Sequence, residues 1–173
     1  AVQRAVGTAL AVGSRYLNAA VLRVTRGASP ATDAQLHELG RDTLVAARTH
    51  GDAVRIYLAE NGGAVEAGML DTTNLIPRLR TAADLIADIA PPPAGLFPRT
   101  REVLEKHTAA LCARLDGSRP DAESTVMSDE LIRALRAEAP PGPDAAMNAL
   151  PLVTAAANIG ELELAYPASV QDG

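Results

Sequence analysis

Apolar side chains recur every three or four positions along most of the chain, the spacing of one face of an α-helix. The first run covers about residues 2–24, and the second runs from Ser29-Pro30 to about residue 60. Between them, Gly27 suits a helix C-cap, whereas Ser29-Pro30 supplies an N-cap and a first-turn proline. Because the connection is short, the pattern predicts two long helices that pack as an antiparallel hairpin.

Four shorter helical runs follow the predicted hairpin, over about residues 74–89, 98–115, 128–138 and 148–166. Proline-rich breaks at 91–95 and 140–143 separate them, and a polar stretch over 116–127 predicts an exposed or mobile loop.

Two of these shorter runs carry a proline close to their expected start. The run over 74–89 has Thr73 or Asn74 as its N-cap, so Pro77 is expected in the first turn, where its missing N–H costs little. Asn148 and Pro151 repeat this arrangement at the start of the last run.

Length and composition fit a single helical domain. The chain has 173 residues, of which 47% are hydrophobic and only 2% aromatic, and alanine and leucine supply most of the apolar positions. These residues favour helices, and small side chains let helix axes approach closely. We therefore predict an all-α fold in which residues 1–173 form one antiparallel bundle of about five to six helices.

Charge is unevenly distributed along the chain. Residues 1–32 contain four arginines and no acid, giving +4, whereas the other 12 basic and 21 acidic residues give −9. A net charge of −5 and an isoelectric point near 5.2 argue against nucleic-acid binding. A basic segment ahead of an acidic body is also typical of cytoplasmic stretches beside membrane spans, although solvated arginines on one helix give the same pattern.

Two features concern where the chain resides. Cys112 is the only cysteine, so no intramolecular disulfide can form, which fits a reducing compartment. No signal peptide and no stretch of 18 uncharged apolar residues is present. The chain begins at Ala1 already in helical periodicity, so we expect it to be a fragment of a longer protein.

Residues with catalytic or metal-binding potential are dispersed. His37 and His50 face different directions on the second helix, and His107 lies five residues from Cys112, not the three or four that align ligands on a helix. We expect His50 to be a hydrogen-bonded core histidine and Cys112 to pack as a small apolar residue with a raised pKa. The sequence therefore predicts no catalytic residue, no metal and no cofactor.

Arg41, Arg48 and Arg55 recur every seven positions on the second helix and therefore share a face. They are the best candidates for an anionic site, as a helical enzyme acting on small anions would need. The alternative that we favour is an exposed ridge that pairs with the acids of a neighbour.

Three segments resemble the cytosolic helical region of bacterial membrane proteins of the fusaric-acid-resistance, or aromatic acid exporter, type (FUSC-like). The resemblance covers most of residues 1–90 and lies in cadence and composition rather than in a diagnostic motif. The segments that carry it are Ala9-Leu10 with Arg15-Tyr16-Leu17-Asn18-Ala19-Ala20, Leu44-Val45-Ala46-Ala47-Arg48, and Leu75-Ile76-Pro77-Arg78-Leu79-Arg80-Thr81-Ala82-Ala83-Asp84-Leu85-Ile86.

The resemblance implies a soluble, non-catalytic domain on the cytoplasmic side of the plasma membrane, serving assembly or gating of a membrane-embedded remainder of the same protein. A second copy of the chain is a further candidate partner. The alternatives are a free-standing cytoplasmic bundle that binds a small molecule, like the effector half of a regulator, and a helical enzyme. The sequence names no ligand.

Overall fold

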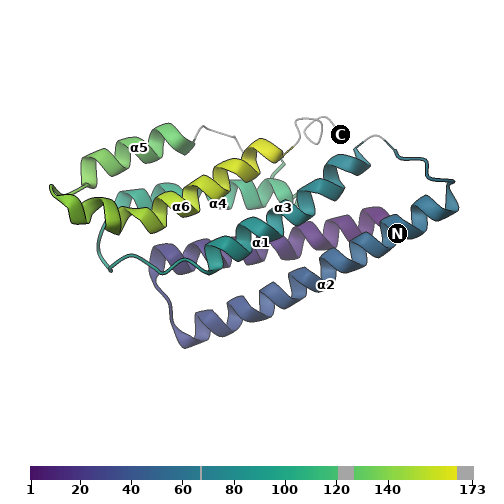
Figure 1. Ribbon diagram of the computed structural model, residues 1–173, viewed down its shortest axis with the longest axis horizontal. Helices are drawn as coiled ribbons and strands as arrows, with labels where there is room; N and C mark the ends of the chain where they lie inside the picture. Colours follow the sequence, from purple (N-terminus) through teal and green to yellow (C-terminus); the bar gives the residue numbers. More distant parts are fainter. Residues whose placement is uncertain (67, 121–126, 167–173) are drawn as a thin grey trace.

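The computed structural model describes residues 1–66, 68–120 and 127–166. Every regular element in these ranges is a helix, which confirms the predicted all-α bundle (Figure 1). The six helices are α1 (Val2–Arg26), α2 (Pro30–Glu60), α3 (Met69–Ala87), α4 (Pro98–Leu115), α5 (Met127–Glu138) and α6 (Pro143–Ala165).

Helix α1 is the centre of the bundle, because it packs against α2, α3, α4 and α6. In Figure 1 it lies between α2 on one side and the remaining helices on the other. Helix α2 contacts only α1 and α3, and α5 contacts only α4 and α6, so these two form the outer edges. The largest fully buried apolar side chains are Leu17, Val21, Val24, Leu79, Ile86, Leu104, Leu111, Leu152 and Ile159.

The predicted hairpin of α1 and α2 is confirmed, and its caps form as expected. The hydroxyl of Ser29 accepts the backbone N–H of Thr32 at 3.2 Å, and the backbone N–H of Ser29 donates to the Thr32 hydroxyl at 2.8 Å. Pro30 is the first residue of α2. Gly27 follows α1 with a φ of 97°, a conformation that costs glycine little.

Small residues let α1 approach its neighbours closely. A Cβ on Gly13 would lie 2.6 Å from Leu79 Cδ2, so a larger residue there would force the Leu79 side chain between α1 and α3 to shift. Gly40 on α2 lies against the ring of Tyr16, whose hydroxyl donates to Asp84 at 2.7 Å. Glycines at these contact positions therefore let α1 pack tightly between α2 and α3.

The predicted starts of the third and last helices are wrong. Helix α3 begins at Met69 and α6 at Pro143, so Pro77 and Pro151 both lie inside helices. An interior proline costs about 3 kcal/mol, and burial of one large apolar side chain returns about 1.5–3 kcal/mol. Helices α3 and α6 pack together, and the burial of several such side chains on these two helices outweighs the cost of the two prolines. The buried side chains are Leu75, Ile76, Leu79, Ile86, Leu152, Ile159 and Leu162.

The proline-rich segment between α3 and α4 is fixed by two arginines. Arg23 donates to the carbonyl oxygen of Ile89 at 2.7 Å, and Arg101 donates to that of Pro93 at 2.7 Å. These bonds join the segment to α1 and α4. Of the loop predicted over 116–127, residues 121–126 lie outside the described ranges.

Candidate functional site

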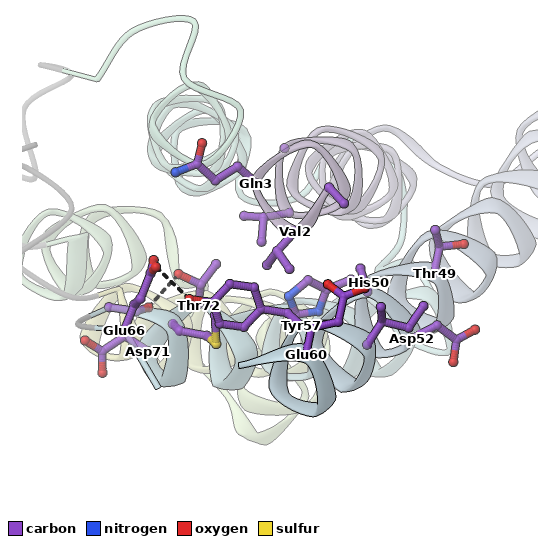
Figure 2. A pocket seen from close by; sticks show the side chains of 17 residues that line it. Val2, Gln3, Thr49, His50, Asp52, Tyr57, Glu60, Glu66, Asp71 and Thr72 are labelled. Carbon is purple, nitrogen blue, oxygen red and sulfur yellow. Dashed lines mark hydrogen bonds between the residues drawn. The ribbon is translucent and has the colours of Figure 1, made fainter. Parts of the chain in front are cut away.

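A groove of about 1070 Å³ opens where the start of α1, the second half of α2 and the start of α3 meet. Figure 2 shows the side chains of the groove, with Val2 of α1 facing Tyr57 and His50 of α2. The walls are largely apolar. Their apolar side chains are Val2, Val6, Ala53, Ile56 and Met69.

The groove exists because small side chains and a glycine-rich connector leave the space between the three helices unfilled here. Gly7 on α1 has no atom within 4 Å of the position where a Cβ would lie, and another lining residue, Ala53 on α2, carries only a methyl group. Between α2 and α3, Gly62 and Gly63 have φ values of 63° and 81°, which turn the chain away from α2 before α3 starts.

Carboxylates surround the groove. Glu60, Glu66, Asp71 and Asp52 line it, and Asp52 forms an ion pair with Arg55 on the same helix. No lysine or arginine occurs among the described residues that line it. Apart from the α-amino group of Ala1, the charged groups that line this concave, partly apolar surface are carboxylates, and their excess produces a local negative potential, which attracts cations and repels anions.

Tyr57 couples the apolar and acidic parts of the groove. Its hydroxyl donates to Glu66 Oε1 at 2.6 Å, which raises the pKa of Tyr57 and keeps the phenol protonated. This bond joins α2 to the connector that leads to α3, as the dashed line in Figure 2 shows. The aromatic face of Tyr57 remains part of the groove lining.

His50 lies in the groove lining and is 3% exposed. Its Nε2 atom is buried and has no hydrogen-bond partner among the described residues. Burial lowers the pKa of His50, so the imidazole is neutral at neutral pH. The expectation of a core histidine is therefore confirmed for burial and wrong for hydrogen bonding at Nε2. A buried polar atom without a partner is uncommon in folded proteins, which makes this position the most unusual one in the groove.

A second polar cluster joins α4, α5 and α6. His107 is 4% exposed, and its Nε2 atom lies 2.9 Å from Glu130 Oε2, which lowers the pKa of that carboxyl. Arg114 is also buried, with its guanidinium 5.4 Å from the ring centroid of Tyr166. Burial raises the pKa of the nearby Glu163. These residues connect three helices, and we assign them a structural role.

Arg41, Arg48 and Arg55 are all exposed on α2, and none of them lines the groove. Arg55 pairs with Asp52 one helical turn away. The three side chains thus form a ridge on the outer edge of the bundle. The structure does not bring them together around a cavity.

Cys112 packs as predicted. It is buried, its Sγ donates to the carbonyl oxygen of Ser14 at 3.3 Å, and desolvation raises the pKa of its thiol to about 12. A thiol with such a pKa is a poor nucleophile. Within the described ranges, no three His, Cys, Asp or Glu side chains come close enough together to hold a metal ion.

Helix α6 exposes an apolar face that nothing in the described structure covers. Met147 and Leu164 are 70% and 89% exposed, and Leu150 and Val153 lie on the same outer side. Positions 150, 153, 157 and 164 carry Leu, Val, Ala and Leu, the three-four spacing of a helix-packing seam. Residues 143–165 include no lysine or arginine.

Sequence reasoning missed the groove, because its residues come from three segments that periodicity treats separately. One local signal was available: Glu60, Glu66 and Asp71 stand close together around the glycine-rich connector. None of the helices in the described ranges has the length and apolar character required to cross a bilayer. Comparison with family models, with curated proteins and with solved structures finds no match for this chain.

Proposed function

We propose that this chain is a non-catalytic interaction domain of a larger bacterial protein, docked on the cytoplasmic side of a membrane-embedded remainder like that of the fusaric-acid-resistance exporters that it resembles. The apolar outer face of α6 is the observation that supports this most directly. Such a face, centred on Leu150 and Val153, is typical of a surface that another helix covers.

Charge supports the same proposal. Residues 1–32 contain four arginines and no acidic residue, and two of these arginines, Arg4 and Arg15 on α1, are exposed and have no ion pair with a described residue, which suits a position next to anionic lipid headgroups. The role of such a domain is assembly or gating. It needs no catalytic residues, and the dispersed histidines and the buried thiol of Cys112 fit that role.

Thiol labelling tests the proposed docking. Because Cys112 is the only cysteine of the chain and is buried, a cysteine introduced by Val153→Cys would report alone, provided that any cysteines of the parent protein outside this chain are replaced. We expect fast maleimide labelling in the isolated chain and much slower labelling in the parent protein within inverted membrane vesicles. Ala137→Cys, on the exposed side of α5, is the matched control and should label equally fast in both. A parent protein that fractionates without membranes, or equal labelling of Val153→Cys in both settings, contradicts the proposal.

The groove favours a second candidate function, a helical bundle that binds a small molecule. Ligand sites are typically concave and mostly apolar with a few polar groups, and volumes of about 300–1,000 Å³ are usual. The groove of about 1070 Å³ has this character, with Tyr57, His50 and Glu66 as its polar groups. Equilibrium dialysis against a library of small cations and anions tests this candidate, and an absence of saturable binding contradicts it.

A further inference from the structure

The unpartnered Nε2 atom of His50 indicates what the groove lacks. Leaving a buried polar atom without a hydrogen bond costs about 1–3 kcal/mol, so a ligand that supplies the bond gains affinity. A neutral imidazole with its proton on Nδ1 presents a lone pair at Nε2 and accepts a hydrogen bond there. The other tautomer would donate from Nε2 instead, but the acidic surroundings of the groove, which attract cations, select the first one, for which the missing group is an N–H or O–H donor.

The charges around the groove limit which donor suits it. Glu60, Glu66 and Asp71 are not ion-paired with any described residue, and the described lining includes no lysine or arginine. A carboxylate ligand would meet repulsion from all three acids, whereas an ammonium or guanidinium group would be attracted. The ring face of Tyr57 adds a further favourable surface for a cation.

We propose that the groove between α1, α2 and α3 binds an amphiphilic organic cation with N–H donors, such as a primary amine or a guanidinium on an apolar body. The cationic group lies among the carboxylates and bonds to Nε2 of His50 once this buried imidazole turns toward the groove that it lines, and the apolar body lies against Val6, Ile56 and Met69. This inference deepens the small-molecule candidate above, and it does not depend on the membrane partner.

The ligand's N–H group distinguishes this site from a general acidic surface. A quaternary ammonium of equal size carries the same charge but has no N–H, so it cannot bond to His50 Nε2. An alkyl carboxylate of equal length has the same apolar body but the wrong charge. Decylammonium, decyltrimethylammonium and decanoate therefore separate the three contributions of hydrogen bond, charge and apolar contact.

Titration calorimetry with these three probes, below their micelle concentrations, tests the proposal on the folded chain. We expect decylammonium to bind about tenfold more tightly than decyltrimethylammonium, because a hydrogen bond in a desolvated site is worth about that factor. Decanoate should bind more weakly than both. Equal affinities for decylammonium and decanoate, or no saturable binding of decylammonium, overturn the proposal.

Two sets of variants locate the site. Glu60→Gln with Asp71→Asn removes two groove charges and should weaken decylammonium binding about fivefold, as loss of two partly exposed charge contacts predicts. Glu38→Gln with Glu102→Gln changes the net charge equally at exposed positions outside the groove, and should have no effect. Equal losses in both double variants overturn the proposal.

His50→Leu tests the hydrogen bond itself. It should remove the preference for decylammonium over decyltrimethylammonium and leave the affinity for the latter unchanged. Circular dichroism and the urea midpoint verify that the variant folds, and His50→Gln, which keeps a hydrogen-bonding side chain, should retain part of the preference. A preference that survives His50→Leu in a folded protein overturns the role of His50 and with it the proposed ligand class. If His50→Leu does not fold, His50→Gln tests the role of His50 instead. An undiminished affinity of His50→Gln for all three probes then contradicts the proposal.

Discussion

The two buried histidines differ in whether the surrounding residues supply a hydrogen-bond partner for Nε2. His107 and His50 are 4% and 3% exposed, so burial alone does not distinguish them. His107 contacts Glu130 in the region of α4, α5 and α6, whereas His50 lies beside the groove with Nε2 unpartnered. Packing gave His107 a partner, although Nε of the buried Arg114 in the same region has none among the described residues, whereas it left His50 beside an open groove. Hydrogen-bond satisfaction, rather than depth, separates a structural histidine from a candidate binding residue.

The largest effect should separate the closed core from the walls of the groove. Leu104 is fully buried, so Leu104→Ala should lower the free energy of unfolding by about 2–5 kcal/mol through lost burial and a residual cavity. Ile56 in the groove is 59% exposed, and Ile56→Ala should change the free energy of unfolding by less than about 0.5 kcal/mol. Urea denaturation measures both. Similar losses for the two variants would mean that the groove is closed in solution.

Replacing each histidine by leucine tests directly whether the two histidines contribute differently to stability. His107→Leu removes the contact with Glu130 and should cost about 1–2 kcal/mol of unfolding free energy. His50→Leu removes a buried group without a partner at Nε2, so it should be neutral or stabilising in the absence of ligand. Thermal and urea unfolding report both changes. A destabilisation by His50→Leu as large as that by His107→Leu would show that His50 has a partner in solution.

The dependence of stability on pH should reveal the same difference on a smaller scale. Burial lowers the pKa of His50 below its ordinary 6.5, so the unfolded chain binds the proton more readily than the folded one. Its contribution to stability is complete above that ordinary value and is lost as the pH falls toward the lowered pKa. The wild type should therefore lose stability below pH about 6.5.

A matched variant isolates the contribution of His50. His50→Leu should show a shallower decline between pH about 6.5 and about 5. Below that window both proteins should lose stability alike, because the pKa values of Glu105 and Glu130 are lowered by Arg26 and His107 respectively. Identical curves for wild type and variant through the upper window would contradict the assigned protonation state of His50.

The smallest effect is expected on the arginine ridge of α2, formed by Arg41, Arg48 and Arg55. Arg48 is exposed, so Arg48→Ala should change the unfolding free energy by less than about 0.5 kcal/mol. It should also leave decylammonium binding unaltered, because Arg48 lies outside the groove. Urea denaturation and calorimetry check the two statements. A clear loss of stability or of decylammonium binding in Arg48→Ala would indicate that the functional surface is the ridge rather than the groove.

Local sequence signals predicted most of the helices and the hairpin. Ser29 followed by Pro30 predicted the start of α2 correctly, because capping depends only on residues within one turn. The same reasoning failed for α3 and α6, because Pro77 and Pro151 resemble first-turn prolines until the packing of α3 against α6 is known. Tertiary contacts there outweigh a local preference.

The candidate site was harder to predict from the sequence than the helices. Periodicity placed His50 on the buried side of its helix correctly, because that depends on the angle between successive residues. Whether Nε2 meets a partner depends on α1 and α3, which are distant in the sequence. Glu66 and Asp71 likewise become neighbours of His50 only when the connector turns at Gly62 and Gly63.

The sequence by itself determined that this protein is helical, that α1 and α2 pair, and that Cys112 is buried, since each depends on the spacing of apolar residues along one helix. Only the tertiary structure decided where the bundle stays open. A groove is the space that remains after several helices have packed, and it depends on small residues of different helices, such as Gly7 and Ala53, lining the same space. The order of residues along the chain does not show which residues of different helices come to line one space.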